Sequence, residues 1–156
     1  MDSDTMNDEQ MLSPASGKIL RIETGEGGSR TITIFMRLHN VHITTAPLNG
    51  VVKEIKSEPG NFKPAFLRSS DFNTKNAIQV STGYGNINVV QIAGFFTRKI
   101  ICDVKEGQKV RKGERVGKIC FGSRVDVSVP DGFEIVVKKG DKVRYKKSVI
   151  AVTKSE

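Results

Sequence analysis

The chain contains two histidines, and both belong to one short motif, His39-Asn-Val-His42. Histidine is the side chain whose proton affinity is best matched to proton transfer near neutral pH. Residues three apart on a strand point to opposite faces, so a turn or bulge is needed if both imidazoles are to line one site. The pair is a candidate for acid–base chemistry, although a lone histidine more often has a structural or surface role.

The candidate nucleophiles are one serine and two cysteines in the second half of the chain. Ser123 follows Gly122 in Cys120-Phe-Gly-Ser-Arg-Val-Asp126. A Gly-Ser pair by itself is common in turns and identifies no site. Cys102 and Cys120 make neither a disulfide framework nor a metal-ligand pattern, so we expect a reducing compartment, no metal, and a structural role for Cys120.

Short apolar runs separated by Gly and Pro must position these residues. The chain is poor in aromatic residues and rich in Gly, Val, Ile and Thr, which predicts a mainly β fold. Residues 1–12 predict a disordered lead-in and residues 13–156 a single domain, with a helical turn or two at 62–72. The longest nearly uncharged apolar stretch, 89–96, is too short to cross a bilayer. The expected strands are 32–36, 51–55, 78–81, 87–92 and 99–104.

A repeat lies in the C-terminal third of the chain. Residues 137–152 repeat residues 104–119, and seven of the sixteen pairs are identical. Gly107 and Gly140 supply the positive φ of a tight turn, and the flanking valines alternate between faces. Two matched hairpins of this kind predict a compact barrel-sandwich (hammerhead-like) β domain with short helical turns, as in biotinyl and lipoyl domains.

The repeat leaves open a lysine-modified carrier protein. Such a carrier needs an exposed lysine at a hairpin tip, in a Met-Lys-Met or Asp-Lys-Ala setting. Here Lys142 follows Asp141 but precedes Val143, and Lys109 holds the same place in the first copy of the repeat. The carrier hypothesis therefore depends on fold analogy, and added covalent mass on Lys142 would identify it.

The net charge of +8 comes from one part of the chain. Residues 1–96 carry nine basic and nine acidic side chains, whereas residues 97–156 carry sixteen basic and eight acidic ones. Such a basic region either faces an anionic partner or serves as a solubilising surface. Nucleic acid is the weaker interpretation, because Tyr145 is the one aromatic residue among the basic ones and no nucleic-acid-binding motif is present.

Several blocks in a fixed order resemble the phosphatidylserine decarboxylase family. The resemblance runs from Ser13 to about Val152, and its longest block, residues 113–126, contains Gly122-Ser123. The other blocks are Ser13-Pro-Ala-Ser-Gly17, His39-Asn-Val-His42 with Ala46-Pro47 and Gly50, Pro59-Gly60-x-Phe62, Asn73-Thr-Lys-Asn76 and Gln91-Ile-Ala-Gly94. Agreement across so many ordered blocks does not arise by chance.

The resemblance implies a pyruvoyl-dependent carboxy-lyase that cuts its own chain between Gly122 and Ser123. In the family, the serine hydroxyl attacks the preceding glycine carbonyl, and the resulting ester is eliminated and hydrolysed to leave a pyruvoyl group. That covalent cofactor would here derive from Ser123, form a Schiff base with a substrate amine and act as an electron sink for loss of CO₂. The implied reaction converts phosphatidylserine, or a related serine-headgroup lipid, to phosphatidylethanolamine.

The resemblance also implies roles for individual residues. His42 is the implied base that activates Ser123, and His39 the implied group for proton transfer during decarboxylation. Arg124 is a candidate for substrate binding, with a plain surface ion pair to Asp126 as the alternative. Phe62 is either a core residue or part of a lipid-facing pocket.

One block departs from the family at the position thought to orient the base. The family aspartate of Ser-Pro-x-Asp-Gly is Ser16 here. A serine can fix an imidazole tautomer but brings no charge, and loss of the orienting carboxylate in a serine protease costs roughly 10⁴ in rate. Because self-cleavage occurs once per molecule, we expect slow maturation with activity retained. The alternative is a non-catalytic, uncleaved homologue that acts as a binding or scaffold module.

The expected partner is an anionic phospholipid surface. Most relatives in the family carry a longer, often membrane-seeking segment before the first block. In this sequence Met1 to Leu12 precede that block. We therefore expect a cytoplasmic protein, peripheral at the membrane, whose basic region contributes about 1 kcal/mol per Lys or Arg near an anionic leaflet. No nucleic-acid partner is expected, and the sequence leaves open a homodimer.

Overall fold

The protein is built almost entirely of antiparallel β-strands. The computed structural model describes residues 9–36, 42–60, 65, 73–94, 100–119 and 122–154. The strands are β1 (Gln10–Leu12), β2 (Gly17–Thr24), β3 (Arg30–Phe35), β4 (Ile43–Thr45), β5 (Gly50–Glu58), β6 (Lys75–Thr82), β7 (Gly85–Ile92), β8 (Ile100–Cys102), β9 (Lys109–Val110), β10 (Arg115–Ile119), β11 (Arg124–Val129), β12 (Phe133–Ile135), β13 (Lys142–Val143) and β14 (Val149–Thr153), with one 3₁₀ turn, η2 (Glu26–Gly28).

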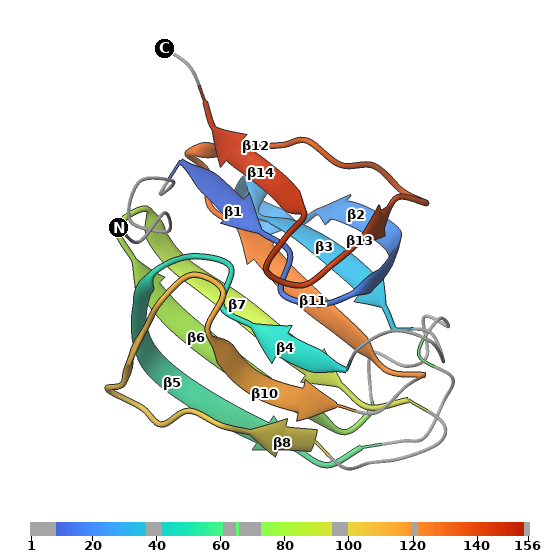
Figure 1. The fold of residues 1–156 in the computed structure, drawn as a ribbon, viewed down its shortest axis with the longest axis vertical. Helices are drawn as coiled ribbons and strands as arrows, with labels where there is room; N and C mark the ends of the chain where they lie inside the picture. The colour runs from blue at the N-terminus through green and yellow to red at the C-terminus, as the bar shows by residue number, and fades with distance from the viewer. Residues whose placement is uncertain are drawn as a thin grey trace.

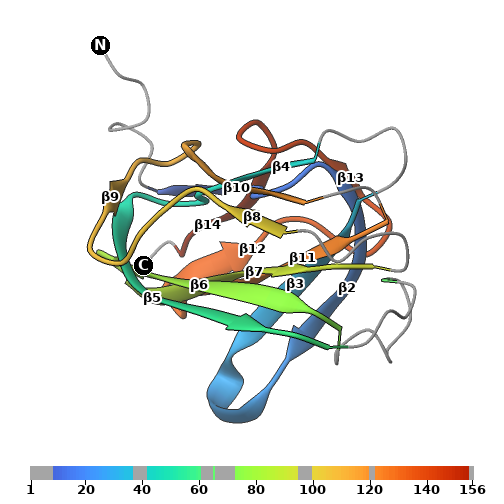
Figure 2. The same ribbon diagram turned by 90° about the horizontal axis from the view of Figure 1, so that it is seen from below.

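The strands form one large sheet and two small ones. The large sheet has eight strands in the order β13-β2-β3-β11-β7-β6-β5-β9, and the small sheets have the orders β1-β14-β12 and β4-β10-β8. The large sheet curls into a half barrel, and the small sheets lie across its open side (Figure 1, Figure 2). The mainly β fold predicted from composition is confirmed, as are the five expected strands.

Side chains alternate between the two faces of each strand, and those on the inner face fill the space between the sheets. In β11, Val125 and Val127 are fully buried and face the core, while Arg124 and Asp126 point to the opposite face of the sheet. The core continues with Ile32 and Ile34 of β3 and with apolar residues of the small sheets. This burial of valine and isoleucine from both layers is the main stabilising contribution to the fold.

The N-terminal segment is ordered where the sequence predicted disorder. Residues 10–12 form β1 and pair with β14, and Met11 is fully buried, so the predicted lead-in is wrong at this end. The backbone hydrogen bonds and the burial of Met11 offset the conformational entropy lost by ordering this segment. The helical turn expected at 62–72 lies outside the described residues, apart from Ala65.

The two copies of the sequence repeat occupy equivalent positions in the fold. Gly107 and Gly140 have φ values of +89° and +94°, which confirms the predicted turns. β9 in the first copy pairs with the start of β5, and β13 in the second pairs with the start of β2. Lys142 therefore lies in a paired strand rather than at the hairpin tip, which removes the structural argument for a carrier lysine.

The same 33-residue offset also relates the N-terminal segments, which the sequence did not reveal. β1 lies 33 residues before β4, and β8 lies 33 before β12. The Thr45 N–H donates to the carbonyl of Pro14 at 2.8 Å, and the equivalent Leu12 N–H donates to Pro47 at 3.1 Å. The fold is thus internally duplicated, and two segments, residues 12–17 and 45–50, are joined to each other by these hydrogen bonds. In the described ranges, no helix has the length and apolar character needed to span a bilayer.

Candidate active site

The Gly122–Ser123 bond is held by backbone hydrogen bonds on one side. The Gly122 N–H donates to the carbonyl of Met36 at 2.8 Å, and the Met36 N–H donates to the carbonyl of Ser123 at 2.9 Å. These bonds extend the β3–β11 pairing by one step beyond Arg124 and Phe35. Gly122 has φ of +80°, a left-handed conformation that suits glycine and disfavours other residues.

The Ser123 side chain is fully buried. Its Oγ has no hydrogen-bond partner among the residues that the structure describes. Buried hydroxyls are nearly always hydrogen-bonded, so a buried hydroxyl without a partner calls for an explanation. The Oγ can reach the carbonyl carbon of Gly122 through a five-membered ring, so the nucleophile and the bond that it would attack already lie in one dipeptide.

The blocks that contain Gly60, Asn73 and Gly94 meet at the end of the large sheet where Gly122 lies. Figure 1 shows β3, β7, β10 and β11 with an end there, and β4 and β6 begin there too. The Gly60 N–H donates to Thr74 Oγ1 at 3.0 Å, and the Asn73 side-chain amide donates to the carbonyl of Ala93 at 2.8 Å. A groove of about 250 Å³ opens beside this end, and its lining includes Pro59, Thr74 and Asn76.

Gly94 lies against the other side of the Gly122–Ser123 bond. A Cβ built on Gly94 would collide with the carbonyl oxygen of Gly122, and would lie 2.8 Å from its carbonyl carbon and 3.4 Å from the nitrogen of Ser123. The bond therefore lies in a slot, which we define as the space between the backbone of Met36 and the Cα of Gly94. Sequence reasoning matched Gly94 to a family block but assigned it no role.

His42 directly precedes β4. Its carbonyl accepts a hydrogen bond from the Ile119 N–H at 3.0 Å, three residues before Gly122. Partial burial, and secondly the positive charge of Lys118, lower the pKa of His42 below its ordinary value of 6.5. The imidazole is therefore neutral at pH 7, the form that can accept a proton.

Ser16 has a structural hydrogen bond. Its Oγ accepts a bond from the Tyr145 N–H at 3.0 Å, and the residue is nearly fully buried. In the duplicated half, Asn49 Oδ1 accepts the equivalent bond from the Lys112 N–H at 2.7 Å. Any short side chain with an acceptor oxygen can therefore make this contact, so the fold itself does not need the charge of the family aspartate. The base-orienting role remains a prediction.

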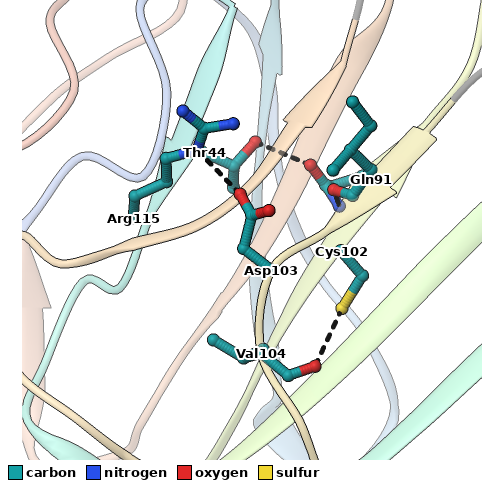
Figure 3. Close-up of polar contacts among 7 residues, drawn as sticks. Thr44, Gln91, Cys102, Asp103, Val104 and Arg115 are labelled. Carbon is teal, nitrogen blue, oxygen red and sulfur yellow. Dashed lines mark hydrogen bonds and ion pairs between the residues drawn. The ribbon is translucent and has the colours of Figure 1, made fainter.

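A buried amide connects the large sheet to the sheet that carries His42. Gln91 in β7 is fully buried; its Oε1 accepts a bond from Thr44 Oγ1 at 2.9 Å, and its Nε2 donates to the carbonyl of Ile101 at 3.3 Å (Figure 3). Gly117 leaves the room that this amide needs, because a Cβ there would lie 2.6 Å from Gln91 Oε1. The bond to Thr44, two residues after His42, fixes β4 relative to β7.

Arg124 and Asp126 form an ion pair, with Arg124 Nη2 and Asp126 Oδ2 3.1 Å apart. The expectation of a plain surface pair is wrong, because Arg124 is 3% exposed. Burial raises the pKa of Asp126, while Arg124 and a hydrogen bond from Thr33 act in the opposite direction. By strand alternation Arg124 points away from the face that Ser123 shares with Val125, so its proposed contact with substrate remains a prediction.

The structure places Gly122 and Ser123 between Met36 and Gly94, and it bonds the His42 carbonyl to Ile119, three residues before Gly122. The Ser16 side chain is bonded to Tyr145. His39, Phe62 and Cys120 lie outside the described residues. Sequence reasoning missed the Met36 backbone, the contact of Gly94 with the Gly122 carbonyl, and the Gln91–Thr44 bond. The glycine that ends an apolar strand and the threonine two residues after a histidine were visible in the sequence, but their contacts join segments far apart in the chain.

Comparison with known proteins identifies the class of this protein as a decarboxylase, that is, a carboxy-lyase. The sequence model described as phosphatidylserine decarboxylase matches residues 3–151. A protein of Methanosarcina barkeri described as an archaetidylserine decarboxylase proenzyme is 40% identical, over 96% of this chain and 71% of its own length. A phosphatidylserine decarboxylase proenzyme of Streptomyces griseus is 41% identical, over 86% of this chain and 63% of its own. The chain belongs to the phosphatidylserine decarboxylase family.

Proposed function

We propose that this protein is a pyruvoyl-dependent decarboxylase of phosphatidylserine or a related serine-headgroup lipid, matured by autocatalytic cleavage between Gly122 and Ser123. One observation carries the proposal: Ser123 Oγ is buried without a partner among the described residues, directly after a glycine at φ +80°. The names of the relatives, archaetidylserine and phosphatidylserine decarboxylase proenzymes, share a serine headgroup and a precursor form.

The proposed cleavage proceeds in three balanced stages. Ser123 Oγ bonds to the carbonyl carbon of Gly122, the amide C–N bond breaks, and the hydroxyl proton passes to the nitrogen, which gives an ester and an amine. Loss of the α-proton of residue 123 then breaks the bond between Cβ and the ester oxygen, which releases Gly122 as a carboxylate. The resulting dehydroalanine tautomerises to an imine as its Cβ gains a proton and its nitrogen loses one, and water then hydrolyses the imine to ammonia and the pyruvoyl group.

The residues around the bond support this chemistry. Glycine at position 122 exposes the carbonyl carbon, because no Cβ obstructs the approach of the hydroxyl. The neutral imidazole of His42 is the proposed acceptor of the Ser123 proton, and the lowered pKa keeps it available at pH 7. When formed, the pyruvoyl group would remain attached to Arg124 through the peptide bond and supply an electron sink for loss of CO₂.

The basic second copy of the repeat is the proposed membrane-facing surface. Its exposed cations are Lys138, Lys139, Lys142, Arg144, Lys146 and Lys147. Val136 beside them is 50% exposed. Lysine and arginine near an anionic leaflet contribute about 1 kcal/mol each, so this surface would hold the protein at its lipid substrate. Binding to phosphatidylserine vesicles that persists unchanged in 1 M salt would argue against this part of the proposal.

The test is a decarboxylation assay with the purified protein and phosphatidylserine vesicles. We expect release of CO₂ and appearance of phosphatidylethanolamine, and neither product with Ser123→Ala, which retains the buried position but has no hydroxyl. Archaetidylserine vesicles, tested in parallel, distinguish between the two lipid classes. Equal product from the wild type and Ser123→Ala would contradict the proposal, and no product with either lipid would favour the non-catalytic homologue.

A further inference from the structure

The contact between Gly94 and the Gly122–Ser123 bond involves backbone atoms on both sides. The atoms nearest to a Cβ on Gly94 would be the carbonyl oxygen and carbon of Gly122 and the nitrogen of Ser123, all of them atoms of the peptide bond proposed for cleavage. Atoms of a flexible side chain could move aside, but the peptide itself would have to shift here. By contrast, the glycines at which an added Cβ would meet open space lie mostly in turns, among them Gly83 and Gly107.

Hydrogen bonds hold the backbone on both sides of the slot, so neither side can shift easily to make room for a Cβ. Residue 93, next to Gly94, is held twice: its N–H donates to the carbonyl of Thr74 at 2.9 Å, and its carbonyl accepts the amide of Asn73 at 2.8 Å. On the opposite side, Met36 bonds both to Gly122 and to Ser123. Asn73 is 1% exposed and Ala93 is fully buried, so solvent cannot substitute for these bonds.

We infer that Gly94 is a positioning residue for self-cleavage, whose missing side chain gives the Gly122 carbonyl the room to become tetrahedral. This inference rests on the proposed function. When Ser123 Oγ adds to the carbonyl carbon, the carbonyl oxygen leaves the plane of the peptide and takes up negative charge. Gly94 borders that oxygen, so it sets the geometry of ester formation and not that of the later elimination.

The substitution Gly94→Ala isolates this effect from backbone strain. Gly122 has a positive φ, but Gly94 does not, so alanine at position 94 adds no strain from a left-handed backbone conformation. The change therefore acts through the added Cβ. A displacement approaching 1 Å in a reacting group can cost about 100-fold in rate, and we expect a loss of that size in the rate of cleavage.

Gly83→Ala is the matched control, because a Cβ there meets nothing within 4 Å and its φ is not positive. Intact mass spectra over time would follow the loss of the uncleaved chain in the wild type and in both variants. Neutral hydroxylamine, which cleaves esters faster than amides, would report whether an ester has formed at 122/123, with the site identified by fragment mass. Thermal melting of Ser123→Ala with and without Gly94→Ala would compare uncleaved chains.

We expect the wild type and Gly83→Ala to be cleaved alike, and Gly94→Ala to stay folded, mostly uncleaved and without hydroxylamine-sensitive ester. Cleavage of Gly94→Ala at the wild-type rate would overturn the inference, as would an accumulating ester, which would move the block to the elimination step. A lost melting transition in the double variant would also overturn it, because Gly94 would then be needed for folding. If the wild type itself stays uncleaved, the proposed function fails, and that result is distinct from all three.

Discussion

The two duplicated halves of the protein, a first half of β1 with β12, β13 and β14 and a second half of β4 with β8, β9 and β10, share a framework, and the second half leads into the candidate site. In both halves a small sheet crosses the large one, a hairpin turn has a glycine at positive φ, and a short polar side chain accepts a loop N–H. In one half, the residue at the position of His42 is Glu9, whose carbonyl accepts the Thr153 N–H at 2.9 Å. In the other half, β10 leads through Gly122 and Ser123 into β11, at the centre of the large sheet.

This difference separates the shared framework from the positions proposed for chemistry. The two halves share the hydrogen bonds of their loops, whereas His42, Gly94 and the Gly122–Ser123 bond have no matching set among the described residues of the other half. Changes at shared positions should therefore affect stability in both halves alike. Changes at the unmatched positions should affect cleavage with little effect on stability.

The largest expected effect comes from restoring a carboxylate at position 16. Ser16→Asp keeps an acceptor for the Tyr145 N–H and adds a charge where the resemblance implies that a base is oriented. We expect cleavage to accelerate by a factor between about 10 and 10⁴, the upper value being the cost of losing such a carboxylate in a serine protease. The time course of fragment formation measures it.

Asn49→Asp is the control for that prediction, because Asn49 makes the equivalent hydrogen bond in the other half. We expect its cleavage rate to match the wild type. The same acceleration in both variants would mean that added charge acts generally, and not through the site.

The next effect is on stability, in the half without the site. Phe133 in β12 is fully buried and packs edge-to-face on Tyr84, with ring centroids 4.8 Å apart. Phe133→Ala should cost about 3–5 kcal/mol in free energy of unfolding, measured by denaturant titration. At temperatures where the variant is folded, its cleavage rate should stay within about twofold of the wild-type rate, because Phe133 lies in the half without the site. A twofold change in rate corresponds to about 0.4 kcal/mol in activation free energy. A large loss of cleavage in the folded variant would break the separation between the halves.

A smaller and matched pair of effects is expected at the two loop contacts. Ser16→Ala and Asn49→Ala each remove the acceptor of a loop N–H. Each should lower the free energy of unfolding by about 1 kcal/mol, the net contribution of a typical hydrogen bond. Urea titration of both variants in a Ser123→Ala background keeps the chains uncleaved. A loss confined to one variant would show that the two contacts are not equivalent.

The smallest effect concerns the pH dependence of cleavage. Neutral His42 is the proposed base, so the rate should fall as pH drops through its lowered pKa, where the imidazole gains a proton. Lys118→Ala removes the positive charge that disfavours the imidazolium, and the acidic limb of the rate profile should therefore move to higher pH. Lys105→Ala, in the exposed turn of the first repeat, should leave the limb in place. A shift to lower pH with Lys118→Ala would contradict the assignment.

Much of the fold could be predicted from the sequence, because local patterns determine strands and turns. Short apolar runs predicted β3 and β7, the neighbours of β11, and the glycines of the repeat predicted turns at positive φ. The duplication at residues 12–17 and 45–50 could not be found, since two identical residues, Pro and Gly, are too few to detect. It became visible through hydrogen bonds between those segments and the repeat.

The candidate site was predictable in its residue types but not in its contacts. The resemblance implied Gly122, Ser123 and His42; the structure places the first two against Gly94 and bonds the His42 carbonyl to Ile119, three residues before Gly122. The approach of Gly94 to the Gly122 carbonyl and the bond between Gln91 and Thr44 connect strands that are separated by tens of residues. Such contacts depend on the register and curl of the sheets, which no local pattern encodes. The burial of Arg124 was missed for the same reason.

The most direct test of the central claim is an intact mass spectrum of the purified protein, with one fraction treated with a carbonyl-reactive amine. The account predicts two chains that divide between residues 122 and 123, with the smaller one lacking a free amino terminus and gaining the mass of the amine adduct. A single chain of 17.2 kDa that persists for days at warm temperature and gains no adduct would contradict it.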